Sequence, residues 1–467
     1  MSVETAGRSD PHAGVATHGT TRPLRGQLLE LRFRRAGRRL ATGVVAMLLM
    51  MPSGAAQSQS PRTLQELRDA VTHADGNERR KAVQALGAHR DPAAVALLLE
   101  TYRSETLDSF GVRAACATAL GETGQPGAAA ALSEILADPD YWVRKQAATA
   151  LGRIPGGLAT QALATAIQDR DPRVRASAAE ALGGREGSGD LLLSAYGDPA
   201  PDVAAAALEA LVVSNHAQAI RLLDQSLADP RWQVQFRAAS LAARKGEPRG
   251  LTALADAVRA NRHVGAALRE AAAVGDPAVA TLTELLDGAD PRLANRVLET
   301  LEDMPGPAAT NFFAALATRS AALPEHRERA ATALFDRRET LTQPQIAQVA
   351  ELLDCGDPNL TAVALQILLE RGGPEYLAGV VPLVHHDNKV VRHFSLSNLR
   401  QHGGVEYEAV FVGALNDANG ANVRLALEAL AESGSSTALP AIRVFANDRK
   451  YRRYAQAAVE AIEARSR

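Results

Sequence analysis

The sequence is poor in aromatic residues, which make up 4% of its 467 positions. A large β-sandwich is therefore not expected, because β-sheets are enriched in aromatic and β-branched side chains. Cysteine is scarce as well: Cys116 and Cys355 are the two in the sequence, and they form no C-x-x-C pair. This excludes a disulfide framework and disfavours a thiolate zinc site. Cys116 stands where related segments carry alanine, so we interpret it as a small core residue.

Motifs of common enzyme classes are missing too. The sequence contains no G-x-S-x-G, Walker-type, dinucleotide-binding or H-E-x-x-H motif. Gly156-Gly157 and Gly372-Gly373 are interpreted as turns rather than phosphate-binding loops. The sequence therefore predicts no catalytic residues, no metal ligands and no cofactor, and we expect a protein that is not an enzyme.

Long apolar runs are absent except near the N-terminus. A basic stretch from Arg32 to Arg39 precedes an uninterrupted apolar run at residues 40–51, and small residues follow up to Ala56. These are the parts of a secretory signal, and twelve apolar residues are too few to span a bilayer, which needs about 20. Residues 1–56 are therefore predicted to be an export segment, with cleavage after Ala56 and a periplasmic, cell-envelope or secreted product in a bacterium. Two alternatives remain: translation could start downstream, or the segment could stay uncleaved as a membrane anchor.

The charge balance bears on the kind of partner. The formal net charge is -2, and because residues 1–56 hold eight Arg and three acids, the remainder carries -7. Binding to nucleic acid requires a basic face for the phosphates. We therefore expect no nucleic-acid partner, and membrane contact only through an uncleaved N-terminal segment.

What the sequence does have is an internal repeat. DPDYWVRKQAATALG at 138–152 and DRDPRVRASAAEALG at 169–183 share the pattern D-P-x-V-R-x-x-A-A-x-A-L-G. The valine of this pattern serves as an anchor, and equivalent positions recur 29 to 34 residues apart. The thirteen anchors are Glu78, Val112, Val143, Val174, Val203, Val234, Val264, Leu293, His326, Leu360, Val391, Asn422 and Tyr451. A constant period of this length indicates a solenoid.

Each repeat is predicted to contain two helices. A first helix of about ten residues, as at 128–137, is followed by an Asp-Pro turn that caps a second helix. A glycine such as Gly152 or Gly183 is expected to end that second helix. One hairpin buries too little apolar surface to be stable, so neighbours must stack. The predicted fold at residues 62–467 is thus all-α, an α-solenoid superhelix of about thirteen two-helix repeats, with the second helices lining its concave groove.

The motif at 169–183 resembles the HEAT-like repeat named after the phycobilisome lyases (PBS lyase HEAT-like repeat), and the resemblance extends over roughly 62–467. It implies an α-solenoid but little about function, since the superfamily includes chromophore lyase subunits, an iron-dependent deoxyhypusine hydroxylase and bacterial scaffolds. That hydroxylase binds iron through His-Glu pairs, and this sequence contains no His-Glu dipeptide. The resemblance therefore gives no basis for the hydroxylase activity.

Charged residues recur in register with the anchors. The pairs are Asp108 with Arg113, Asp138 with Arg144, Asp171 with Arg175, and Asp387 with Arg392. They could form a charged binding ladder. We favour a structural role, in which Asp caps a helix and Arg pairs with Asp groups of adjacent turns.

The groove is the predicted binding surface for a protein or peptide partner. Six residues six or two positions after an anchor are its candidate contacts: Glu180, Glu209, Glu270, Glu299, Glu428 and Phe236. An ordinary solvated helix face explains the same residues equally well. Val363, Phe394, Leu425 and Tyr454, three positions after an anchor, would form an apolar patch if exposed, although packing between repeats is favoured. Trp142 and Trp232 are interpreted as wedges between repeats.

One histidine-rich region is a weak candidate for a metal site. His385, His386, Asp387, His393 and His402 supply suitable ligand types, but their spacing matches no metal signature. The preferred function is an exported, non-catalytic scaffold that binds protein. The alternative is an enzyme or enzyme subunit of the lyase or hydroxylase type, supported by family analogy alone.

Overall fold

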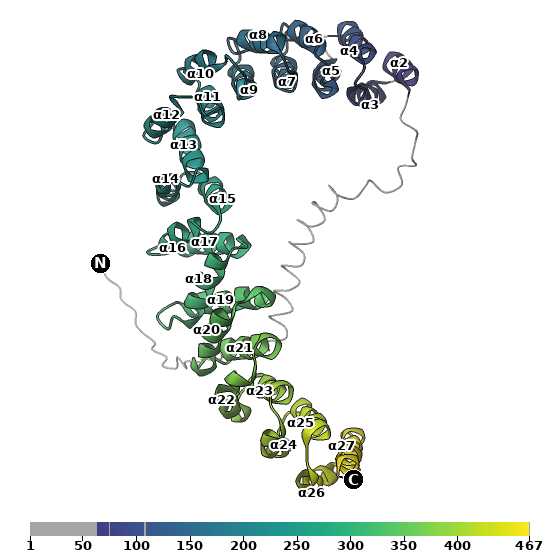
Figure 1. Ribbon diagram of the computed structural model, residues 1–467, viewed down its shortest axis with the longest axis vertical. Coiled ribbons are helices and arrows are strands. Elements are labelled where there is room, and N and C mark those ends of the chain that lie inside the picture. Colours follow the sequence, from purple (N-terminus) through teal and green to yellow (C-terminus); the bar gives the residue numbers. More distant parts are fainter. Residues whose placement is uncertain (1–62, 74, 107–108, 467) are drawn as a thin grey trace, which may run out of the picture. The chain divides into compact units, whose positions relative to one another are not determined.

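The computed structural model describes residues 63–466 apart from 74 and 107–108, and in this part of the chain every regular element is a helix (Figure 1). Residues 62–467 form one compact unit. The predicted export segment lies outside the described residues. Within them, no helix is long and apolar enough to cross a membrane.

The helices pair in chain order, and the described residues hold thirteen such pairs, as the anchors predicted. In the labels of Figure 1, even numbers are first helices of a repeat and odd numbers are second helices. The first eight repeats are α2 (Leu64–His73) with α3 (Gly76–Gly87), α4 (Pro92–Ser104) with α5 (Phe110–Thr123), α6 (Ala128–Ile135) with α7 (Tyr141–Leu151), α8 (Gly157–Ala166) with α9 (Pro172–Leu182), α10 (Gly189–Tyr196) with α11 (Pro201–Val213), α12 (Ala219–Ser226) with α13 (Trp232–Arg244), α14 (Pro248–Arg259) with α15 (Val264–Val274), and α16 (Ala278–Glu284) with α17 (Pro291–Asp303).

The last five repeats are α18 (Pro307–Thr318) with α19 (Pro324–Asp336), α20 (Gln343–Ala350) with α21 (Pro358–Arg371), α22 (Leu377–Val380) with α23 (Lys389–His402), α24 (Glu408–Ala414) with α25 (Gly420–Ser433), and α26 (Leu439–Arg443) with α27 (Arg452–Arg465). From α20 onward the first helices are short and are extended by 3-10 turns, which are η2 (Arg338–Thr340), η3 (Glu351–Asp354), η4 (Pro374–Tyr376), η5 (Val381–His385), η6 (Val405–Tyr407), η7 (Ser436–Ala438) and η8 (Val444–Asn447). Prolines at 374, 382 and 440 contribute to this interruption, because proline lacks the amide donor of a helix interior.

An Asp-Pro turn starts α9, α17 and α21 as predicted. Asp171 is extended at the N-cap of α9, its side chain accepts a hydrogen bond from the Arg173 amide, and Pro172 occupies the first helical position. Asp140, Asp290 and Asp357 cap α7, α17 and α21 in the same way. Such caps typically stabilise a helix by about 1 kcal/mol each.

Successive second helices pack on one another, α5 on α7 and α7 on α9, while α6 packs on α4 and α8 (Figure 1). The core between the two layers consists mainly of Ala, Leu and Val. Because each repeat contacts mainly its neighbours, the fold is that of an all-α solenoid.

Gly152 and Gly183 stand at the C-caps of α7 and α9, as predicted, but not in the conformation that favours glycine there. Gly152 and Gly183 have φ of -57° and -56°, so neither adopts the left-handed conformation of a terminating glycine. Instead, glycine lets the next repeat approach. A methyl group on Gly121 would stand 2.7 Å from Cβ of Ala150, and one on Gly152 would stand 3.1 Å from Cβ of Ala181. The glycine that recurs at this position therefore allows close packing of the second helices.

The predicted register of the last repeat is wrong by three residues. In α7 the anchor Val143 is the third residue after the N-cap Asp140, whereas the predicted anchor Tyr451 is itself the N-cap of α27. The equivalent position is Tyr454, so the last spacing is 32 residues. Tyr451 makes no side-chain capping bond. The sequence therefore carries no cap signal that would mark where α27 begins.

Candidate partner-binding face and inter-repeat polar contacts

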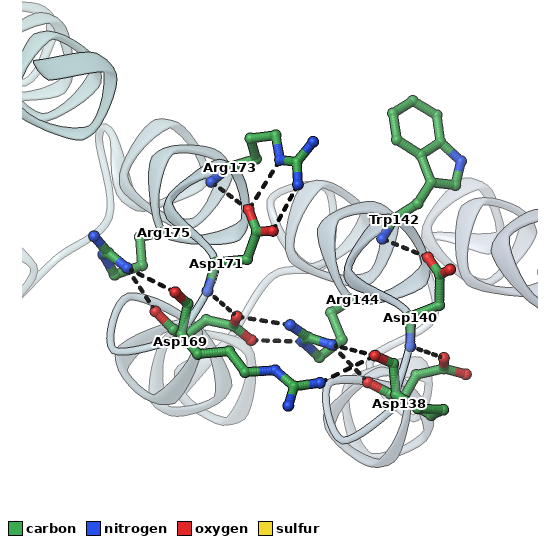
Figure 2. Close-up of polar contacts among 10 residues, drawn as sticks. Asp138, Asp140, Trp142, Arg144, Asp169, Asp171, Arg173 and Arg175 are labelled. Atoms are coloured by element: carbon green, nitrogen blue, oxygen red, sulfur yellow. Dashed lines mark hydrogen bonds and ion pairs between the residues drawn. The ribbon is translucent and has the colours of Figure 1, made fainter. Parts of the chain in front are cut away.

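In several repeats the arginine that follows the anchor joins two turns. Arg144 donates from Nη1 to the carbonyl oxygens of Asp138 and Pro139, which belong to the turn before its own helix. From Nε and Nη2 it binds Asp169 of the next repeat at 2.7 and 3.0 Å (Figure 2). Asp169 also accepts a bond from the Asp171 amide. One guanidinium thus fixes the geometry of its own turn and the position of the following turn.

The same contact recurs along the chain. Arg113 pairs with Asp138, Arg175 with Asp198, and Arg392 with Asp417. We call these contacts, with that of Arg144 and Asp169, the Arg–Asp ladder. Its side chains are 1% to 16% exposed, so each charge depends on its partner for solvation.

The ladder confirms the predicted pairing of Arg with Asp groups of adjacent turns. Asp138 does not bind Arg144 through its carboxylate; it binds the arginine of the preceding repeat. Capping belongs to a second polar residue two positions on, such as Asp140. Asp108 lies outside the described residues. The structural role of the recurring charges is thus observed, with the pairs formed across the repeat boundary.

A second set of arginines donates hydrogen bonds to carbonyl groups at or just after the C-terminal ends of second helices. Arg185 donates from Nη2 to the carbonyl oxygens of Leu151, Gly152 and Ile154 in the preceding repeat. Burial lowers the pKa of its guanidinium. Arg337, Arg371 and Arg465 bind carbonyls of their preceding repeats in the same manner. These residues were missed in the sequence, although each stands eleven positions after a correctly placed anchor.

The predicted groove residues lie on the second helices, but most of their charges are balanced. Glu209 pairs with Arg237 at 3.0 Å, Glu270 with Arg244 at 2.8 Å, and Glu428 with Arg400 at 2.6 Å. Two more of the set, Glu180 and Glu299, are exposed, and Phe236 is half-buried against the core. The row is therefore not a continuous acidic stripe, since arginines of adjacent repeats neutralise three of its five glutamates.

The four residues of the predicted apolar patch are packed into the array. Val363 and Leu425 are buried, while Phe394 and Tyr454 are half-buried against the core. With the corrected register, Tyr454 also stands at an anchor position rather than in line with the other three. These residues join repeats and form no exposed apolar strip.

Comparison with known families accounts for the repeat. Residues 106–183 match the HEAT repeats family, and residues 78–103 match the PBS lyase HEAT-like repeat family. This chain is a HEAT-like repeat protein. The two matches span α3 to α9, and the paired helices continue with the same arrangement to α27. No curated protein matches the chain.

Solved structures similar to this HEAT-like repeat protein show low identity. They include Kap121p bound to Pho4p (13% identity, 92% of this chain and 51% of that chain, TM-score 0.40). The complex of CpcE and CpcF of phycocyanin lyase from Nostoc sp. PCC7120 is 20% identical over 67% of this chain and 97% of that chain, with a TM-score of 0.26. Human deoxyhypusine hydroxylase is 16% identical over 73% of this chain and 97% of that chain, with a TM-score of 0.24. Similarities of this size do not bear on activity.

The histidine-rich region of this HEAT-like repeat protein is engaged in local contacts. His386 Nδ1 accepts a bond from the Asn388 amide, His393 bonds the Asn422 side chain, and His402 bonds the Leu369 carbonyl. Among the described residues, no three His, Cys, Asp or Glu lie close enough together to hold a metal ion.

Cys116 and the two tryptophans differ in how deeply they are buried. Cys116 is fully buried, and burial raises the pKa of its thiol, as fits a core residue. Trp232 stacks on His263 of the next repeat with ring centroids 3.8 Å apart, so it does contact a neighbouring repeat. Trp142 is 40% exposed beside Lys145 and is not a buried wedge.

Proposed function

We propose that this HEAT-like repeat protein is a non-catalytic scaffold that binds a protein or peptide partner along its second helices. The main observation behind this proposal is that the recurring charged residues bind one another and the backbone within the repeat array. The Arg–Asp ladder and the carbonyl-binding arginines act within the array and hold neighbouring repeats together. Side chains on the outer face of the second helices, such as Glu180, Asn295 and Arg424, remain exposed and vary in type from repeat to repeat.

The repeat architecture supports this proposal on physical grounds. A solenoid presents an extended surface whose backbone is the same in every repeat, so side chains alone define what it binds. The mildly acidic composition disfavours a nucleic-acid partner. We further propose export through residues 1–56, which rests on the order of basic, apolar and small residues in the sequence.

The binding face can be tested by site-specific photocrosslinking in the source cells. A photoreactive residue replaces Glu180, Asn295 or Arg424 on second helices and, as matched controls, Arg221 or Thr252 on first helices, all of them exposed. We expect one protein to crosslink from second-helix positions only. That protein is then identified and its binding measured with purified components.

Crosslinking from first-helix positions alone, or no measurable binding between the purified proteins, would contradict the proposal. Export is tested separately by cell fractionation and by the N-terminal sequence of the mature chain. We expect that sequence to begin at Gln57, and an unprocessed cytosolic protein would refute export.

A further inference from the structure

The turn before α15 differs from the Asp-Pro turns that precede six of the other second helices. It reads Asn261-Arg262-His263, and the two outer residues have φ of 54° and 47°. His263 is the N-cap of α15 and makes no side-chain capping bond. No carboxylate caps this helix, and the turn itself carries the basic side chains of Arg262 and His263.

A cavity of about 290 Å³ opens beside this turn, between α13, α14 and the start of α15. Its apolar wall includes Trp232, which is 43% exposed, and the half-buried Phe236. His263 stacks on Trp232 at its rim. One carboxylate, Asp256, also lines the cavity, but it is paired with Arg259 at 2.9 Å. The cavity thus offers an aromatic surface with room for one or two side chains.

Two arginines converge on the other side of the same turn. A methyl group on Gly265 would stand 2.8 Å from Nη2 of Arg296 and 3.5 Å from Nη1 of Arg269. Both arginines are exposed, and neither forms an ion pair within the described part of the chain. Their position contrasts with Arg237, Arg244 and Arg400, each of which binds a glutamate of an adjacent repeat. Two like charges held together without a carboxylate favour an anion from outside.

We propose that Trp232, Phe236, Arg269 and Arg296 form a docking site for an acidic peptide segment that carries an apolar side chain. This rests on the proposed function and adds its position and chemistry. The apolar side chain enters the cavity, where an aromatic wall excludes water. A carboxylate on the same segment binds the two guanidiniums, whose planar donors match carboxylate geometry.

The observations favour a peptide over other polyanions. The cavity lies at the lower end of the size range of small-molecule pockets and suits a single side chain. The basic feature consists of two arginines in an acidic chain, whereas binding to a nucleic-acid backbone requires an extended basic face. An anionic lipid surface is treated as an outcome of the test.

The test uses the full chain and fluorescently labelled synthetic peptides in an anisotropy titration. Each peptide has a Gly-Ser background with one Phe or Leu followed at varied spacing by Glu residues. Matched peptides carry Gln in place of Glu, or Ser in place of the apolar residue. The protein variants are Arg269→Glu combined with Arg296→Glu, Trp232→Ala, and the control Arg221→Glu on α12. Circular dichroism verifies that every variant is folded.

We expect saturable binding of the peptides that combine Glu with an apolar residue. Affinity falls at least about tenfold with the Gln peptide, the Ser peptide, the double reversal or Trp232→Ala, and it declines with added salt. The control Arg221→Glu binds as the unmodified chain does. No saturable peptide binding, or equal binding by the double reversal, overturns this site.

A third outcome also overturns this site. If no peptide binds, and phosphatidylserine vesicles bind the unmodified chain but not the Arg269→Glu, Arg296→Glu variant, the partner is a lipid surface. The photocrosslinking experiment reads the whole second-helix face. A partner that crosslinks elsewhere on that face therefore leaves the proposed function standing when this site fails.

Discussion

Replacing Asp138 by alanine tests whether the Arg–Asp ladder holds the repeats together. Asp138 accepts bonds from Arg113 Nε and Nη2 at 2.8 and 3.2 Å, from the Tyr102 hydroxyl at 3.0 Å and from the Asp140 amide at 2.8 Å. The Arg113 side chain is 4% exposed. Its charge would remain buried without the carboxylate of Asp138, so we expect a destabilisation of about 3–5 kcal/mol.

The assay must report on the repeats around the change, because a repeat array need not unfold as one unit. Urea unfolding followed by circular dichroism gives the overall effect. Hydrogen exchange of peptides from α5 to α7 gives the local free energy of opening. The control is Arg103→Ala, which removes an ion pair with Glu134 whose side chains are 60% and 42% exposed. We expect this control to cost less than about 1 kcal/mol.

A paired variant separates the lost partner from the lost packing. Arg113→Met combined with Asp138→Leu removes both charges, and apolar replacement of a whole buried pair is often neutral or stabilising. We expect it to recover much of the loss, but not the bonds from Tyr102 and the Asp140 amide. A cost below about 1 kcal/mol for Asp138→Ala, or no recovery in the double variant, would refute the reasoning.

Three further predictions concern other inter-repeat contacts. Gly121→Ala forces a methyl group against the facing alanine of α7 and is expected to lower the free energy of urea unfolding by about 1–3 kcal/mol. The control Gly111→Ala, which has nothing within 4 Å of the added methyl group, should be neutral or stabilising. Equal effects of the two substitutions would exclude close packing as the reason for glycine at 121. The arginine partner lowers the pKa of Asp417 from 3.8 to about 2, so its stabilisation is fully present above pH 3.8 and is lost as the pH falls through 2. That loss is about 2 kcal/mol, and the Asp417→Asn variant should lack this acid dependence of hydrogen exchange in α23 to α25; an identical acid profile in the variant would contradict it. Arg185→Ala leaves three carbonyl oxygens without their hydrogen-bond donor and should speed hydrogen exchange at the end of α7. The control Arg221→Ala should leave that exchange unchanged. Unchanged exchange in Arg185→Ala would show that water replaces the guanidinium.

The fold could be predicted because the signals that define it are local. Asp171, Pro172 and Val174 mark a turn, a helix start and a buried face within four residues, and eleven of the thirteen anchors stand three positions after the N-cap of their helix. The other two, Val264 and Tyr451, are out of this register, and neither α15 nor α27 has a side-chain cap. A capping side chain is one of the local signals that mark a helix start.

The sequence predicts that the recurring arginines pair with aspartates of adjacent turns, but it does not select the particular partner, which depends on how one repeat sits on the next. Arg144 has an aspartate six positions before it and another 25 positions after it, and both are sequence-compatible partners. Only the packing of α7 on α9 selects Asp169. In the same way, Glu209 and Glu270 form an acidic row in the sequence, but arginines three or more positions off that row neutralise them across the repeat boundary.

The Arg–Asp ladder gives two repeats, α6 with α7 and α8 with α9, two unlike ends. An arginine reaches forward out of one unit, and an aspartate in the next unit receives it. A copy of such a unit inserted in tandem finds both of its partners, because the sequence before it offers an arginine and the sequence after it offers an aspartate. Excision of a whole unit leaves the same two groups facing each other. Adding or removing a whole unit of this kind therefore leaves every buried charge paired. A cut in the middle of a unit leaves a buried charge without its partner.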